Sequence, residues 1–230
     1  MKIKGIPAVL SALILTAALV LPSSAEGALY EISTNEKVVA LTFDDGPHPV
    51  YTEQILDTLS EYSVKATFFI IGENAKAFPE MVKKELELGH EVENHTLSHC
   101  YLSKLSTCDI EKQLEESERI FREIGGESFR FLRPPGGLFD KRVSAIAEER
   151  GYLSTVLWSL DTKDWAHNPS RNIISYVIKN CGPGDIILMH DYISGRSPTL
   201  PALKSFIPKL KELGYEFVTI SELFGMRNNG

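Results

Sequence analysis

The chain of 230 residues carries 24 lysine and arginine residues against 31 aspartate and glutamate residues, a formal net charge of −7. This acidic balance argues against a nucleic-acid partner, whose phosphates require basic patches, but it does not exclude a neutral or cationic substrate. The length suffices for one domain with a full core, and no repeat, low-complexity tract or Pro/Ser-rich linker divides it.

Residues 1–25 are typical of a secretory signal peptide. Lys2 and Lys4 form a basic region, the run Ile6–Leu21 is almost wholly apolar, and small residues precede a cleavage point after Ala25. The apolar run is shorter than the roughly 20 residues of a membrane span, although a retained N-terminal anchor is the alternative. We expect cleavage, a charge change from −7 to −9, no stable membrane insertion, and a secreted or cell-wall-associated protein.

After a short polar lead-in over residues 26–36, strand-like and helix-like segments alternate through a predicted domain at 37–226. The strand candidates are rich in β-branched or aromatic residues: Val38–Phe43, Ala66–Ile71, His90–Asn94, Phe129–Arg133, Leu153–Ser159, Asp185–His190 and Glu216–Thr219. The helix candidates are amphipathic: Tyr51–Tyr62, Pro79–Leu88, Thr107–Ile124, Lys141–Arg150, Pro169–Asn180 and Leu200–Leu213.

This alternation predicts a single α/β domain with a parallel sheet. Continuous apolar strands such as Thr67–Ile71 fit burial on both faces. Chemically suggestive residues follow nearly every strand, which favours a barrel with one functional rim over an open sheet. The dinucleotide fingerprint Gly-x-Gly-x-x-Gly does not follow the first strand candidate.

The three cysteines are Cys100, Cys108 and Cys181, an odd count that cannot be fully paired within one chain. Cys100 and Cys108 could pair, but their spacing alone is weak evidence. The sequence has no Cys-x-x-Cys, which argues against a thiolate metal site. We expect three buried free thiols.

The first strand candidate ends in two adjacent carboxylates, Asp44 and Asp45, within the run Leu41-Thr42-Phe43-Asp44-Asp45-Gly46-Pro47. Gly46-Pro47 predicts a turn, so both carboxylates are expected at the carboxyl end of the strand, where α/β folds usually build ligand sites. Neighbouring aspartates repel each other unless a cation or a division of roles stabilises them. An exposed acidic turn is the alternative for this run taken alone.

The third strand candidate leads into His95 and His99, whose spacing would bring two imidazoles to one side of a helical turn. With one aspartate they form a set of two imidazoles and one carboxylate, which is typical of catalytic zinc and resembles the facial triad of non-haem iron oxygenases. Two hydrogen-bonded histidines at a strand end are the alternative.

Three later strand candidates also end in polar or aromatic residues. Arg133 opens the run Arg-Pro-Pro-Gly-Gly, and beside Asp44 it would hold that carboxylate ionised. Trp165 follows Asp164 in a loop and is either a sugar or acyl platform or a packed lid residue. His190 ends the sixth strand candidate and adds one more imidazole at the same rim.

Together these segments resemble a polysaccharide deacetylase of carbohydrate esterase family four, the group of the nodulation chitooligosaccharide deacetylase. The resemblance covers Lys37–Phe224 and implies a distorted (β/α)7 barrel. The family's motifs occur in order as Thr42-Phe43-Asp44-Asp45-Gly46, His95-Thr96-Leu97-Ser98-His99, Arg133-Pro134-Pro135-Gly136, Asp161-Thr162-Lys163-Asp164-Trp165 and Leu188-Met189-His190.

The resemblance implies that Asp45, His95 and His99 hold a divalent metal. Zinc is expected, with Co²⁺, Ni²⁺ or Mn²⁺ as alternatives. It also implies that Asp44 is the general base on the attacking water and that Arg133 tethers Asp44.

The remaining roles are implied in the same way. The backbone N–H of Gly136 would stabilise the oxyanion, His190 would protonate the leaving amine, and Asp164 would orient His190. The substrate-binding residues would be Trp165 and Leu188, which form a slot for the acetyl methyl group, together with Pro135.

One position departs from the family pattern. Gly136 and Gly137 follow the two prolines, where the family commonly carries tyrosine. The main-chain contact to the oxyanion can persist, but an aromatic wall is lost, so the shape of the substrate subsite is expected to differ.

The expected function is metal-dependent hydrolysis of N-acetyl groups on a polymer containing GlcNAc or MurNAc, outside the cell, by a monomer. Peptidoglycan is the first choice and chitooligosaccharide the second. An O-acetyl xylan esterase of the same family is the nearest rival. An iron oxygenase and a sugar-binding protein without catalysis are the other classes considered.

Overall fold

The computed structural model describes residues 28–228, so the predicted signal peptide at 1–25 lies outside the described residues. The strands are β1 (Val38–Asp44), β2 (Thr67–Ile70), β3 (Glu91–Asn94), β4 (Phe131–Leu132), β5 (Ser154–Thr155), β6 (Leu160–Asp161), β7 (Ile186–His190) and β8 (Glu216–Val218). The α-helices are α1 (Tyr51–Glu61), α2 (Gly72–Ala77), α3 (Pro79–Glu87), α4 (Thr107–Ile124), α5 (Lys141–Glu149), α6 (Ser170–Asn180), α7 (Thr199–Glu212) and α8 (Ile220–Gly225). The short 3-10 helices are η1 (Leu102–Lys104), η2 (Pro135–Gly137), η3 (Asp164–Ala166) and η4 (Met226–Asn228).

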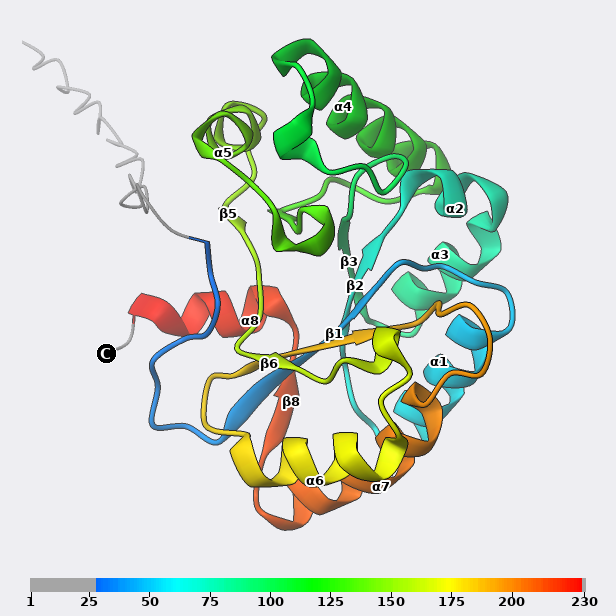
Figure 1. Cartoon of the computed structure of the whole chain (residues 1–230), viewed down its shortest axis with the longest axis vertical. Helices are drawn as coiled ribbons and strands as arrows, with labels where there is room; N and C mark the ends of the chain where they lie inside the picture. The colour runs from blue at the N-terminus through cyan, green and yellow to red at the C-terminus, as the bar shows by residue number, and fades with distance from the viewer. Residues whose placement is uncertain (1–27, 229–230) are drawn as a thin grey trace, which may run out of the picture.

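The strands form one curled parallel sheet in the order β5-β4-β3-β2-β1-β7-β6, and β8 pairs with the first half of β1. Most of the helices lie around the outside of this sheet (Figure 1). The predicted α/β fold with a distorted (β/α)7 barrel is confirmed, because β5 and β6 are two pieces of one passage of the chain. The first piece pairs with β4 and the second with β7, so residues 154–161 bridge both margins of the curled sheet.

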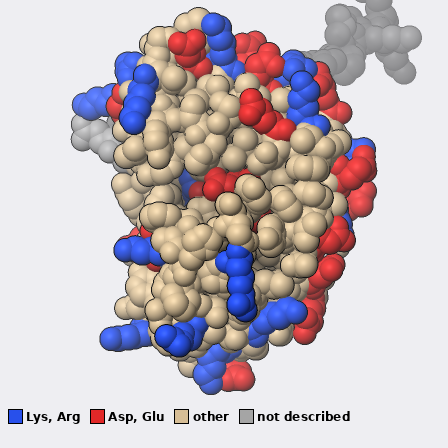
Figure 2. Space-filling view, turned by 45° about the vertical axis from the view of Figure 1, so that its right-hand side comes forward, with Lys and Arg blue, Asp and Glu red and all other residues tan. Residues whose placement is uncertain are grey.

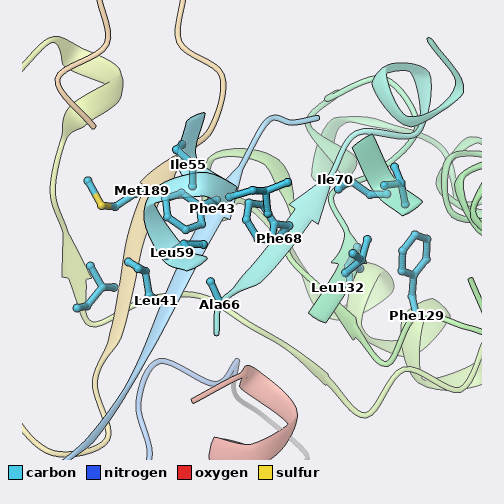
Figure 3. Packing of buried hydrophobic residues seen from close by; sticks show 14 of the residues in the cluster. Leu41, Phe43, Ile55, Leu59, Ala66, Phe68, Ile70, Phe129, Leu132 and Met189 are labelled. Atoms are coloured by element: carbon cyan, nitrogen blue, oxygen red, sulfur yellow. The ribbon is translucent and has the colours of Figure 1, made fainter. Parts of the chain in front are cut away.

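The alternation of side chains along β1 separates two apolar layers. Leu41 and Phe43 belong to the larger cluster between the sheet and the helices, where the ring of Phe43 stacks on Phe68 of β2 at 5.1 Å between centroids. Figure 3 shows Ile55 and Leu59 of α1 packed over these side chains. Burial of this apolar surface is the main force that holds the helices on the sheet.

The other face of β1 points into the barrel. Val38 and Ala40 pack in a smaller cluster with Ile220 and Leu223 of α8, which covers the amino end of the barrel. The next inward position, Thr42, is polar and fully buried, and it leads to the carboxyl end of the barrel. The chain therefore fills the amino half of the barrel with apolar side chains and reserves the carboxyl half for polar groups.

The segment before β1 is part of this structure. Leu29 and Ile32 are buried, Leu29 N–H donates to Thr155 O at 2.8 Å, and Leu157 N–H donates to Leu29 O at 2.7 Å. The expectation of a polar lead-in over 26–36 thus missed the apolar residues that pack against the bridging passage 154–161.

Two short helices were not predicted. Helix α2 has six residues, too few to show an amphipathic period. Helix α8 begins at a Thr219–Glu222 capping box, a signal that is present in the sequence but follows a strand candidate without a break.

The expectation of three buried thiols was also wrong. All three cysteines are free, but Cys108 is exposed, and Cys100 and Cys181 are only partly buried. Cys108 lies in the first turn of α4, whose sequence pattern turns it towards solvent. Within residues 28–228, no helix combines the length and hydropathy that a membrane crossing requires.

Candidate active site

The two carboxylates after β1 point to different partners because the chain turns sharply between them. Asp44 ends β1, and Asp45 has a φ of 77°, a left-handed conformation that few residues other than glycine adopt. A glycine follows, and a Cβ at Gly46 would lie only 1.9 Å from Oδ2 of Asp191. This turn therefore requires a glycine at 46, and it separates the surroundings of Asp44 from those of Asp45.

Asp45, His95 and His99 form a candidate metal centre. The ligand atoms of these three side chains lie within 4.8 Å of one another. Oδ1 of Asp45 is 3.1 Å from Nε2 of His99 and 3.5 Å from Nε2 of His95. Burial raises the pKa of Asp45, but the two imidazoles beside it outweigh burial and lower that pKa far below its ordinary value. Oδ1 of Asp45 is buried and has no hydrogen-bond partner among the described residues, as expected of an atom that would bind a cation.

The donor set fits a divalent metal. Two imidazole nitrogens and one carboxylate oxygen suit zinc and leave coordination positions open. Nδ1 of His95 is 2.6 Å from Arg133 O, so with its proton on Nδ1 the ring directs Nε2 towards Asp45. Such an outer hydrogen bond is what orients a metal-binding histidine.

The spacing of His95 and His99 predicted a helical turn. That prediction is wrong, because neither residue lies in a helix. Residues 95–99 form an irregular loop in which Thr96 and His99 have φ values of 73° and 56°. The Asn94 side chain accepts from Thr96 N–H at 2.7 Å, and the Thr96 hydroxyl accepts from His99 N–H at 3.1 Å. These side-chain turns, which asparagine and threonine favour, bring the two ring centroids to 5.1 Å.

Asp44 pairs with an arginine that is buried completely. Nη1 of Arg133 donates to Asp44 Oδ1 at 2.7 Å and to the Thr42 hydroxyl at 2.8 Å. Nε and Nη2 donate to the carbonyls of Val156 and Leu157 at 3.2 and 3.0 Å. Burial lowers the pKa of Arg133 while Asp44 opposes that change, and the guanidinium stays charged.

His190 and Asp164 form a second buried pair on the same rim. Nδ1 of His190 is 2.8 Å from Asp164 Oδ1, and Asp164 Oδ2 accepts from His190 N–H at 2.9 Å and from the Thr199 hydroxyl at 2.7 Å. Burial lowers the pKa of His190, but the hydrogen bond and charge of Asp164, with the charges of Asp44 and Asp45, raise it to about 9. These contacts therefore favour the imidazolium form of the ring.

The remaining predicted site residues lie around this centre. Gly136 is in η2 beside the buried Pro135 and has a φ of 62°. Leu188 is buried in β7, whereas Trp165 in η3 is 53% exposed. The structure thus places Leu188 inside the barrel and Trp165 at its surface, and a common acetyl slot between them remains a prediction.

Several residues of the site were not singled out from the sequence. Thr42 supports Arg133, Thr199 supports Asp164, and the carboxyl group of Asp191 lies fully buried against the Gly46 turn, where it accepts from the Thr52 hydroxyl at 2.5 Å. Burial raises the pKa of Asp191 to about 7. Only Thr42 could have been identified from the sequence. It lies two residues before Asp44 on β1, so both side chains point to the same side of the strand.

The middle of the face seen in Figure 2 is mostly uncharged. Figure 2 brings the right-hand side of Figure 1 forward and shows acidic atoms in a hollow near the middle of the face. Lysine and arginine side chains lie mainly towards the margin of this view.

The fold is that of the carbohydrate esterases of family four. The structure superposes on the crystal structure of a peptidoglycan N-acetylglucosamine deacetylase with a TM-score of 0.83 and 38% identity, over 86% of this chain and 92% of the other. The polysaccharide deacetylase family model matches residues 31–154, and the chain belongs to that family.

Two relatives show the range within the family. A peptidoglycan-N-acetylglucosamine deacetylase of Bacillus cereus is 45% identical over 196 residues, which cover 84% of this chain and 91% of the relative. A chitooligosaccharide deacetylase of Sinorhizobium fredii is 39% identical over 193 residues, which cover 79% and 89%.

Proposed function

We propose that this protein is a secreted, metal-dependent deacetylase that removes N-acetyl groups from glycans containing GlcNAc or MurNAc, with peptidoglycan as the substrate. The observation that carries the proposal is the meeting of three groups on one rim: the Asp45-His95-His99 cluster, the Asp44–Arg133 pair and the His190–Asp164 pair. The similarity to the Bacillus cereus enzyme supports the choice of peptidoglycan, and the basic and apolar run at 1–25 supports export.

The roles of the chain's own residues follow from their surroundings. Asp45, His95 and His99 would hold the metal, which when bound would supply a Lewis acid for the water and the acetyl carbonyl. Asp44 is oriented by Arg133 and can accept a proton from the attacking water. Because Arg133 is fully buried and charged, it fixes the position of that carboxylate without competing for the proton.

The later half of the reaction needs a donor on the other side of the acetyl group. The N–H of Gly136, on a turn without side chains, would donate to the developing oxyanion. His190 would protonate the departing amine, since its raised pKa keeps it charged at neutral pH. The expelled amine nitrogen is a poor leaving group unless protonated, which suits an N-acetyl substrate to this pair.

Replacing Asp164 by asparagine should shift the alkaline fall of kcat/KM to lower pH. The acid works only while His190 is protonated, so activity falls as the pH rises through its pKa. Without the Asp164 charge, that pKa should fall from about 9 towards the ordinary value of about 6.5. The measurement is kcat/KM against pH between 6 and 10 (roughly the range that spans both values).

Asp161→Asn is the matched control, because Asp161 accepts from Lys163 N–H and does not contact His190. Its alkaline limb should coincide with that of the parent protein. An Asp164→Asn variant with an unchanged limb would show that His190 is not the acid.

The substrate class is decided by acetate release. Mature protein supplied with divalent metal is incubated with peptidoglycan, chitin oligomers and acetylxylan. We expect acetate from peptidoglycan first and from chitin oligomers second. Acetate from acetylxylan alone would instead identify an O-acetyl esterase.

A further inference from the structure

We propose that Tyr101 forms an aromatic wall of the glycan-binding groove, beside Gly136, and that a pyranose ring of the substrate stacks on it. The inference deepens the proposed function, since it names a residue that contacts the sugar rather than the acetyl group. At Gly136 and Gly137, in the turn that follows Arg133, the rim offers backbone but no side chains.

Gly136 and Gly137 both adopt left-handed conformations, with φ values of 62° and 69°. Side chains are rarely found in this region, so the turn gains its shape from two glycines. The same two residues give the groove no side chain of its own at the point where the oxyanion contact is proposed. A substrate sugar held there needs an apolar surface from another element.

Tyr101 supplies such a surface from the loop after β3. A Cβ built on Gly136 would lie 3.1 Å from Cε1 of Tyr101 and 3.9 Å from Cγ of Leu138. Tyr101 is 44% exposed and Leu138 is 48% exposed. The edge of the tyrosine ring therefore lies next to the bare turn, and together the two side chains make an exposed apolar patch at the catalytic rim.

The loop that carries Tyr101 is anchored in the core. Tyr101 directly precedes η1, whose Leu102 is fully buried and anchors the loop in the core. Nζ of Lys104 lies 4.7 Å from the centre of the Tyr101 ring, a cation–π contact. Two residues earlier, His99 belongs to the candidate metal centre, so the ring and the reacting group share one short loop.

A fixed, half-exposed tyrosine suits a sugar polymer. An aromatic ring offers a large apolar face with little loss of side-chain freedom, and its hydroxyl can still bond to water or to a sugar hydroxyl. The axial C–H groups of a pyranose form a matching apolar face. An acetyl group without a sugar cannot use this wall, so the wall discriminates between glycans and small acetyl esters.

The test compares Tyr101→Ala with Tyr101→Phe and with Tyr30→Ala as a matched control. Tyr30 is 50% exposed and lies before β1, between the bridges that its neighbours Leu29 and Glu31 form with Val156 and Asp185. The probe is tetra-N-acetylchitotetraose, and its Kd is measured by calorimetry in the metal-loaded Asp44→Asn background, which does not consume the ligand. We expect Tyr101→Ala to weaken binding about three- to tenfold, and the other two variants to bind as the background does.

Steady-state rates complete the test. In the otherwise unaltered enzyme, Tyr101→Ala should raise KM for the oligomer by the same factor, whereas the control Tyr30→Ala should leave KM and kcat unchanged. Equal Kd values for Tyr101→Ala and the background would contradict the proposal that a sugar ring stacks on Tyr101. An unaltered enzyme that binds the oligomer but releases no acetate from it would overturn the proposed N-deacetylation alone, because the Kd comparison still decides the role of Tyr101.

Discussion

Asp44→Asn should abolish acetate release and leave the metal bound. Asparagine cannot accept the proton of the attacking water, and loss of a general base lowers rates by about 100- to 10,000-fold. Asp44 is not among the three candidate ligands, although its Oδ2 lies 3.7 Å from Nε2 of His95, so metal content by mass spectrometry of the purified protein should match that of the parent. The variant also leaves Arg133 buried without an opposite charge, so thermal stability should fall.

Asp45→Asn and His99→Ala are the controls for this prediction. Asp45→Asn removes the negative charge from the candidate metal centre and His99→Ala removes one imidazole, while both keep the Asp44–Arg133 pair intact. Both variants should lose metal. Their thermal stability should therefore be close to that of the metal-free parent protein. Acetate release by Asp44→Asn at more than half the parent rate would mean that another group is the base, and full metal content in both controls would reject the ligand set.

Arg133→Met is expected to destabilise the fold more than any other single change proposed for this site. The variant leaves the Asp44 carboxylate buried without its partner, and it also leaves the carbonyls of Val156 and Leu157 without their donors. Removal of one member of a buried ion pair costs about 3 to 5 kcal/mol. For a domain of this size that corresponds to a fall in Tm of about 10 °C, measured by differential scanning calorimetry of the metal-loaded protein.

The double variant Asp44→Asn/Arg133→Met separates charge from packing. Neither charge is then left unpaired, so the double variant should be more stable than Arg133→Met alone. The loss of unfolding free energy in the double variant could instead equal the sum of the losses in the two single variants. In that case the carbonyl contacts of Arg133, and not its pairing with Asp44, account for its contribution.

The succession of strands along the chain was predictable because each carries its own apolar run and turn signal. The division of the fifth strand was not, since residues 154–161 change partners midway, from β4 to β7, and only the closure of the whole sheet dictates that change. The N-terminal pairing of Leu29 with Val156 was equally invisible, because it depends on a partner more than a hundred residues away.

The site shows the same division between local and distant information. The types of the candidate site residues and their places at strand ends could be predicted from the motifs. The loop that brings His95 to His99 uses left-handed residues that spacing alone does not reveal, so a helical turn was predicted instead. Thr199 and Asp191 support the site from other parts of the fold. In the sequence neither can be told apart from an ordinary buried polar residue, so neither was predicted.

The guanidinium of Arg133 has a consequence for how the molecule opens. It binds the general-base candidate with one nitrogen and the carbonyls of the bridging passage 154–161 with the other two. The N–H of Leu157 in that passage bonds to Leu29 of the N-terminal segment. Separation of the barrel margins would therefore release the catalytic carboxylate at the same moment, and slow hydrogen exchange at the Leu157 amide should report on the integrity of both. In this enzyme, opening of the barrel at the bridging passage 154–161 would therefore also disrupt the candidate active site.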